Sequence, residues 1–235
     1  MKKRLLIMAL AGLLLASCSF DFSADLYVQD VADILETQEP IYTNATFGFE
    51  FSGDEEDKQQ AIDLLTANLY EAENFREEDR DFQTYLLADY KIPLVYAAAP
   101  EDIPTNPELQ NHLFAFAITG NEGTLDVYAV FNQALFDRLD NQIYEQAYQH
   151  IELAESSMRI FLINDSRESI NAVIAAMYVN NAPVPYVGTY SLERRDQIEI
   201  RFSDVLRDSF GVQLETDSAN IRIRKVAEIV TGTAG

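Results

Sequence analysis

The segment Thr43–Phe51 has an apolar side chain at every second position from Ala45 onward, and this alternation constrains the fold more than any other feature of the chain. A period of two residues is typical of a strand with one buried face. The pattern therefore predicts a β-sheet that covers a hydrophobic core. The residues on the predicted buried face are Ala45, Phe47, Phe49 and Phe51.

Similar patterns predict further strands and a few helices along the chain. The expected strands are 20–28, 82–95, 113–119, 124–131, 158–163, 170–179, 184–192, 197–202 and one near 221–223. The expected helices are 31–35, 54–74, 132–153 and 204–210. No strand–helix alternation with glycine-rich turns appears, so we expect an α+β fold rather than a doubly wound sheet. It should have mainly antiparallel sheets, a few packed helices and a β-meander in the C-terminal third.

Two neighbouring strands differ from the others because they are apolar on both faces. The segments Leu113–Thr119 and Thr124–Phe131 flank a short turn, Gly120–Gly123, which predicts a β-hairpin. Strands without a polar face are usually covered on both sides. We therefore expect this hairpin to lie in the centre of the sheet.

The pattern changes near residue 155, from mixed helix and strand to mostly strand. This predicts an α+β N-terminal domain at 18–155. Residues 156–235 would form either a β-rich C-terminal domain or a continuation of the same sheet. The charge distribution changes later, near residue 193, so the sequence leaves these alternatives open.

The N-terminus has the three parts of a secretory signal. Lys2, Lys3 and Arg4 precede an uncharged apolar run, Leu5–Leu15, and the small residues that follow end at Ser17. The apolar run is too short for a helix that crosses about 30 Å of hydrocarbon. We therefore expect residues 1–17 to be a cleaved signal peptide.

The only cysteine of the chain follows directly. The tetrapeptide Leu15-Ala16-Ser17-Cys18 resembles the lipobox of bacterial lipoproteins. The resemblance implies that Leu15, Ala16 and Ser17 are read by the signal peptidase and that Cys18 carries covalent lipid. Two or more acyl chains hold a protein stably on a membrane. Ser19, rather than aspartate, follows the cysteine, which in Gram-negative lipoproteins implies the periplasmic face of the outer membrane.

Acylation of Cys18 would remove the only thiol, and with it disulfide, zinc-thiolate and cysteine-nucleophile chemistry. The remainder of the chain resembles, in general layout, proteobacterial lipoproteins of unassigned role. That resemblance implies no activity.

The chain is strongly acidic, with a formal net charge of −22. Residues 21–192 hold 31 acidic and seven basic residues, whereas residues 193–228 hold eight and seven. Nucleic acid is excluded as a partner because phosphate binding needs a cationic surface. Electrostatic docking on anionic lipid is disfavoured for the same reason. The acidity indicates either a solvated surface suited to saline conditions or attraction of cations or a basic protein partner.

Candidate chemical groups are few. His112 and His150 have no partner at the spacing of a zinc motif. Neither a Gly-x-Ser-x-Gly elbow nor a phosphate-binding glycine loop occurs in the sequence. The acidic segment Asp54-Glu55-Glu56-Asp57, with 77–81, is a weak calcium candidate that lacks EF-hand spacing. The alternative for these acids is a solvated helix N-terminus.

These observations favour a membrane-anchored, non-enzymatic binding or accessory module of the cell envelope, with no cofactor beyond the lipid on Cys18. Its partners would be the membrane, through the lipid, and a protein of the envelope. One alternative is a carrier whose aromatic strands enclose a hydrophobic ligand. The other is a hydrolase that uses two carboxylates, for which the sequence selects no pair.

Overall fold

The computed structural model describes residues 19–80, 83–121, 123–147, 150–151, 153, 156–204 and 220–231. The strands are β1 Phe20–Tyr27, β2 Ile41–Glu50, β3 Glu73–Arg80, β4 Gln83–Tyr96, β5 Phe114–Asn121, β6 Thr124–Asn132, β7 Ser157–Ile163, β8 Ile170–Val179, β9 Ala182–Leu192, β10 Gln197–Phe202 and β11 Ile221–Thr231. The helices are α2 Val28–Thr37, α3 Glu55–Asn68 and α4 Gln133–Ala147, with 3₁₀ helices η2 Pro100–Thr105 and η3 Glu108–Asn111.

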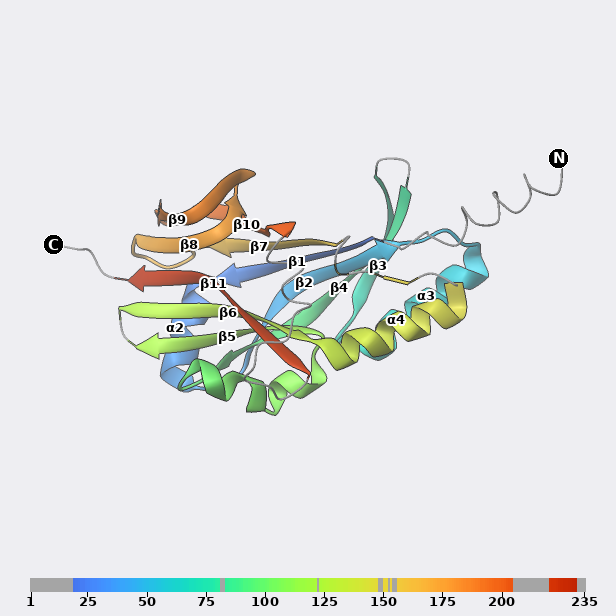
Figure 1. Cartoon of the computed structure of the whole chain (residues 1–235), viewed down its shortest axis with the longest axis horizontal. Coiled ribbons are helices and arrows are strands. Elements are labelled where there is room, and N and C mark those ends of the chain that lie inside the picture. The colour runs from blue at the N-terminus through green and yellow to red at the C-terminus, as the bar shows by residue number, and fades with distance from the viewer. Residues whose placement is uncertain are drawn as a thin grey trace.

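Nine of these strands close into a barrel (Figure 1). The order around it is β10-β7-β1-β2-β4-β5-β6-β11-β8, and β8 pairs with β10 to close the circle. The pairs β1–β7 and β4–β5 are parallel, and the other seven pairs are antiparallel. β3 pairs with β4, and β9 pairs with β8, outside this circle. Full closure leaves the nine strands without a free edge.

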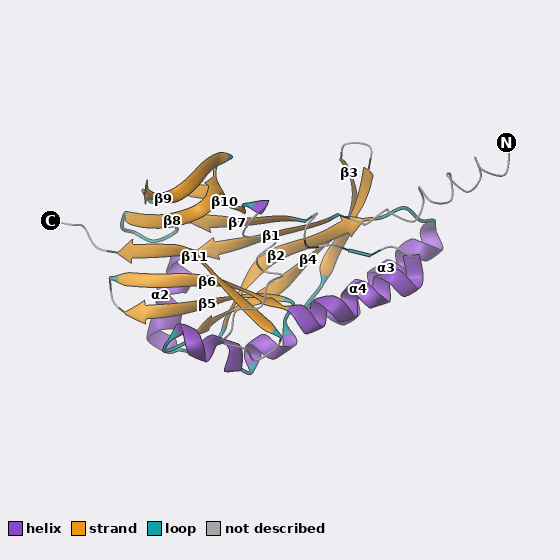
Figure 2. Cartoon of the chain, viewed as in Figure 1, coloured by secondary structure: helices purple, strands orange, loops and turns teal. Residues whose placement is uncertain are grey.

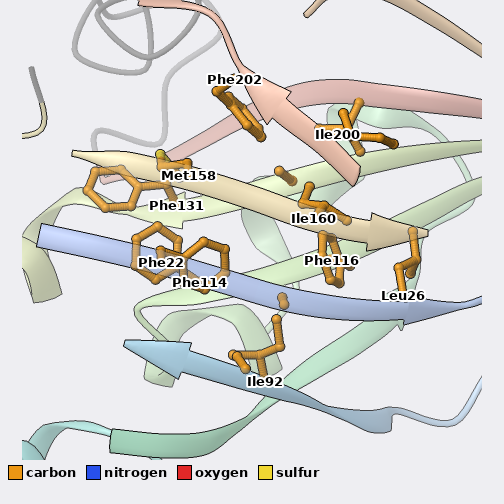
Figure 3. Packing of buried hydrophobic residues seen from close by; sticks show 14 of the residues in the cluster. Phe22, Leu26, Ile92, Phe114, Phe116, Phe131, Met158, Ile160, Ile200 and Phe202 are labelled. Carbon is orange, nitrogen blue, oxygen red and sulfur yellow. The ribbon is translucent and has the colours of Figure 1, made fainter. Parts of the chain in front are cut away.

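Alternation along each strand sends one set of side chains into the barrel. Phe22 on β1 is opposite Phe47 on β2, and both are buried. Figure 3 shows aromatic and aliphatic side chains from β1, β4, β5, β6, β7 and β10 pointing toward one another. The barrel interior is therefore a packed hydrophobic core.

The helices add to this core. Figure 2 shows α3 and α4 side by side at one end of the molecule and α2 near the other. Phe136 of α4 packs between Phe20 and Phe131, with ring centroids 5.5 and 5.3 Å away. Ile34 of α2 is fully buried in the same cluster. The helices at the two ends of the molecule thus add side chains to the hydrophobic core inside the barrel.

The hairpin of β5 and β6 is covered on both sides, which confirms the expectation for central strands. Its inward face joins the main core. Its outward face packs with Ile103 of η2 and Leu109 of η3 in a second buried cluster. The segment before β5 therefore forms two 3₁₀ helices that cover the sheet.

The expected fold class is wrong. The chain is mainly β and forms a closed barrel, not an α+β arrangement of open antiparallel sheets with packed helices. The C-terminal meander is also wrong, because β7 pairs with β10 and, in parallel, with β1. Local alternation gives the positions of most strands, but it does not encode which distant strand becomes a neighbour. Of the helix expected at 204–210, only Asp204 belongs to the described residues.

Candidate functional site

The lipobox residues Leu15, Ala16, Ser17 and Cys18 lie outside the described residues. The described chain starts with Ser19, and β1 begins at Phe20. The backbone oxygen of Ser19 already accepts a hydrogen bond from Glu50 N at 3.0 Å. The residue directly after the cysteine is therefore hydrogen-bonded to the end of β2.

The calcium candidates form the N-terminus of α3. The Asp54 carboxylate accepts from the backbone N–H groups of Glu56 and Asp57 at 2.9 and 3.2 Å. In return, the Asp57 carboxylate accepts from Asp54 N at 3.1 Å. This is a capping box, which satisfies backbone donors that the helix leaves open. Glu55 and Glu56 lie exposed beside it.

The second acidic segment comes close to this helix, but a lysine lies between them. Lys58 Nζ is 2.8 Å from Glu77 Oε1 on β3. The Lys58 ammonium group thus pairs with a carboxylate of the second acidic segment. Across the described ranges, no group of three or more His, Cys, Asp or Glu side chains has the arrangement of a metal site.

The two histidines lie in separate surroundings. His112 is buried against Tyr42 and Tyr70, and its Nε2 lies 3.3 Å from Glu108 Oε1. Burial lowers the pKa of His112 below its usual value, partly opposed by Glu108. His150 is exposed, stacks on the Tyr144 ring at 4.2 Å and contacts Asp140 through Nδ1 at 2.9 Å. The structure therefore gives them no common site.

The outer face of the barrel carries a polar cavity of about 330 Å³, which we call the outer cavity. Because strand side chains alternate, the positions between the buried residues of β1, β2 and β4 point outward. Ser23 is opposite Thr46, which is opposite Asp89 on the next strand. The residues that line the outer cavity are Ser23, Ala24, Asp25, Asn44, Ala45, Thr46, Glu71, Glu73, Asn74, Asp89, Tyr90 and Lys91.

One side of the outer cavity comes from the turn that leads into β3. Glu71 and Asn74 have φ values of 52° and 53°, in the left-handed region. The register of β3 against β4 shifts between Glu73 and Arg76, as in a β-bulge. A bulge bends its strand and redirects side chains. The distortion thus brings polar residues of the turn over the outer face of the barrel.

The carboxylates of the outer cavity differ in their surroundings. Burial raises the pKa of Asp25, and a 3.4 Å hydrogen bond from Tyr27 partly opposes this shift. Asp89 Oδ1 accepts from Thr46 Oγ1 and from Arg76 Nη1, each at 2.9 Å. Lys91 donates to Asn44 Oδ1. One carboxyl group is therefore shifted toward its protonated form and another is held by an ion pair.

The outer cavity can bind a polar ligand. Four carboxylates face one lysine among its lining residues. Carboxylate and amide oxygens accept hydrogen bonds from hydroxyl and amine groups, and the excess negative charge favours a cationic or polyhydroxyl molecule. Sequence reasoning missed this site, because its residues occupy ordinary outward positions on three strands. Only the polar turn Glu71–Asn74 offered a local signal.

Comparison with protein families matches residues 20–219 to a family described as a domain of unknown function, DUF7424. The chain belongs to the DUF7424 family. The match starts with β1 and includes every residue that lines the outer cavity, and it ends before β11. No curated protein and no solved structure matches this DUF7424 chain.

Within the residues that the structure describes, no helix of this DUF7424 protein is long and apolar enough to cross a bilayer.

Proposed function

We propose that the protein is an outer-membrane-anchored lipoprotein that acts as a non-enzymatic binding module on the periplasmic face. The observation that carries this proposal is the tetrapeptide Leu15-Ala16-Ser17-Cys18 behind a basic and apolar leader. Lipid on Cys18 would hold the chain on the membrane. Ser19 as the following residue supports the outer membrane as the destination.

The fold supports a body that lies close to the bilayer. Only Ser19 separates Cys18 from β1, and the Ser19 hydroxyl contacts the Tyr85 hydroxyl on β4. A long flexible tether would need a polar linker at this point. With such a short connection, the outer cavity on β1, β2 and β4 is held near the membrane surface as the ligand site of the module.

Loss of the acyl-accepting cysteine tests this proposal. We expect Cys18→Ser to accumulate as an unprocessed precursor and wild-type protein to fractionate with the outer membrane. Mass spectrometry of the mature N-terminus should find a diacylglyceryl adduct on Cys18. Ser19→Ala is the matched control, because it changes the neighbouring residue and keeps the thiol. Normal processing and unchanged fractionation of Cys18→Ser would contradict the proposal.

The arrangement of aromatic residues does not favour the alternative of a hydrophobic carrier. Phe47, Phe49, Phe114 and Phe116 are at most 3% exposed and belong to the packed core. Phe51, at the end of β2, packs against the same core. These rings fill the barrel, and the outer cavity is lined mainly by polar residues.

A second candidate function, a carboxylate-based hydrolase, is favoured by one observation. Asp25, with its raised pKa, and Asp89, with its ion pair, line the same cavity. A general acid and a second ionised carboxylate are the groups that such hydrolysis uses. Hydrolysis of p-nitrophenyl glycosides that is lost in Asp25→Asn and kept in Glu36→Gln, an exposed carboxylate of α2, would support it. Equal rates in both variants would contradict it.

A further inference from the structure

A buried carboxylate between two arginines lies at the start of β1. Asp21 points to the outer face of the barrel, and its side chain is only 9% exposed. Its Oδ2 accepts from Arg159 Nη2 on β7 at 2.6 Å and from Arg80 Nη1 at the end of β3. Arg80 is held further by Glu78, at 2.7 and 3.1 Å, and lies over the Tyr85 ring.

Two polar atoms of this cluster have no partner. Asp21 Oδ1 and Arg159 Nε are both inaccessible to solvent and make no hydrogen bond. A buried donor or acceptor without a partner is costly, and in native structures such groups are usually satisfied by protein, water or ligand. Here an unused acceptor and an unused donor belong to directly paired side chains. A bound molecule that offers both a hydroxyl and an anionic oxygen would satisfy them.

These side chains border a cavity of about 220 Å³, which we call the arginine pocket. Its lining carries two arginines against one aspartate. Glu78, outside the lining, pairs with Arg80, and Arg201 lies opposite Arg159, so three cations face two anions here in a chain of formal charge −22. The residues that line it are Ser19, Phe20, Asp21, Arg80, Gln83, Tyr85, Ser157 and Arg159. Hydroxyl groups thus accompany the two guanidinium groups, as in sites that hold phosphate.

A third arginine strengthens the local attraction for an anion. Arg201 on β10 is directly opposite Arg159 on β7. Like charges in directly opposed positions are destabilising, and an anion beside Arg159 would offset this repulsion. The Arg201 guanidinium stacks on Tyr178, 4.7 Å from the ring centroid, and is thereby held in place.

We propose that the arginine pocket binds a phosphate ester that carries a neighbouring hydroxyl group. The guanidinium groups of Arg159 and Arg80 donate to the phosphate oxygens. A side-chain rotation that turns Asp21 Oδ1 from its buried position toward the pocket lets it accept from the ligand hydroxyl. Because Ser19 lines the pocket and follows Cys18, the glycerophosphate headgroup of a membrane lipid is the nearest source of such a ligand. The choice of a membrane lipid as the source rests on the proposed membrane anchor. The binding of a phosphate ester by the pocket does not depend on that anchor.

Titration of the full-length protein in neutral detergent tests the proposal. We expect sn-glycerol 3-phosphate to bind at least about tenfold more tightly than glycerol. Arg159→Lys keeps the charge and removes Nε, and should weaken binding about tenfold, the effect of one charge-assisted hydrogen bond. Arg167→Lys, at an exposed arginine in the turn after β7, is the matched control and should bind like wild type.

A second variant tests the arginine pocket independently, in case Arg159→Lys does not fold. Ser157→Leu fills the arginine pocket without removing any member of the Asp21–Arg80–Arg159 cluster, and should also abolish binding. Absence of binding by wild-type protein, or equal binding by wild type, Arg159→Lys and Ser157→Leu, would overturn the proposal.

Vesicles distinguish the source of the ligand. If the headgroup is the ligand, phosphatidylglycerol vesicles should compete with sn-glycerol 3-phosphate and phosphatidylcholine vesicles should compete at least about tenfold less. Equal competition, or none, would overturn the headgroup as the source. Acylation of Cys18 is scored separately by mass spectrometry, so failure of the anchor and failure of the pocket give different results.

Discussion

The rings of Phe22 and Phe114 stack with centroids 4.1 Å apart, although their strands, β1 and β5, are not neighbours in the sheet. β2 and β4 lie between them in the strand order. The two rings therefore meet across the inside of the barrel (Figure 3). This contact joins strands from opposite parts of the closed sheet.

Truncation of either ring should destabilise the protein strongly. Both side chains are 3% exposed, and Phe→Ala changes in a packed core cost about 3–5 kcal/mol. Phe22→Ala and Phe114→Ala should each lower the free energy of unfolding by that amount in urea titrations. In the double mutant the losses should differ from their sum by about 1 kcal/mol, since the rings are in contact. Tyr186→Ala, at a ring that is 84% exposed, is the control and should change stability by less than about 0.5 kcal/mol.

The capping box of α3 predicts a contrast between neighbouring acids. Asp54→Ala removes the acceptor for two backbone N–H groups and should cost about 1 kcal/mol. Glu55→Ala, at a side chain that is 92% exposed, should cost less. Thermal unfolding at pH 7 measures both changes.

Calcium is a further test of the same residues. Asp54 and Asp57 are engaged with the helix backbone, and Lys58 of α3 pairs with Glu77. Millimolar Ca²⁺ should therefore raise the melting temperature no more than NaCl of equal ionic strength. A larger shift that disappears in Asp54→Ala would show that these acids do bind the metal.

Two carboxylates of the outer cavity should respond in opposite directions to amide substitution. The pKa of Asp25 is raised by burial, so its ionised form is disfavoured in the folded state. The protonated Asp25 carboxyl group contributes stability below pH 3.8, the pKa of Asp25 in the unfolded chain. This contribution is lost as the pH rises through the higher pKa that Asp25 has in the folded protein. At pH 7, Asp25→Asn should therefore stabilise the protein, by a fraction of a kcal/mol because the group is partly solvated.

Asp89→Asn is the matched comparison. It removes the charge that pairs with Arg76 at 2.9 Å, and should destabilise by up to about 1 kcal/mol. Urea titrations at pH 7 and pH 3 measure both variants, and the advantage of Asp25→Asn should shrink at pH 3. Destabilisation by Asp25→Asn at pH 7 would show that its carboxylate is stabilised rather than desolvated.

His112 should make stability depend on pH. Burial is the main cause that lowers the pKa of His112, and Glu108 partly opposes this shift. The neighbouring Tyr42 and Tyr70 rings carry no charge between pH 7.5 and 5. Below the unfolded pKa of 6.5 the unfolded chain gains a proton that the folded chain resists, so stability falls as pH drops toward the folded pKa. His112→Gln should flatten the loss of unfolding free energy between pH 7.5 and 5.

The sequence predicts the positions of most elements well, because burial of one strand face leaves a period of two. β2 is an example, and the strands of the β5–β6 hairpin were recognised instead as apolar runs that flank a turn. β3 was missed, since Glu73–Arg80 is almost entirely polar and is held by backbone pairing to β4. Closure of the barrel was also missed, because the parallel pair β1–β7 joins residues more than 130 positions apart.

The candidate sites were less predictable than the fold. The helix start at Asp54 follows from local capping rules, and the structure has a capping box there. The outer cavity and the arginine pocket depend on the register of distant strands. Asp21 and Arg159 come together through the β1–β7 pair, which no local pattern encodes.

The residue after Cys18 predicts the destination of the protein. If Ser19 permits transport to the outer membrane, Ser19→Asp should place an acidic retention signal there and leave the lipidated protein in the inner membrane. Sucrose-gradient separation of the two membranes, with immunoblotting, measures the distribution. Ser19→Ala also loses the hydroxyl contact with Tyr85 but carries no charge, so it should remain in the outer membrane. If Ser19→Asp and Ser19→Ala distribute alike, sorting does not depend on this residue and the outer-membrane assignment loses its support.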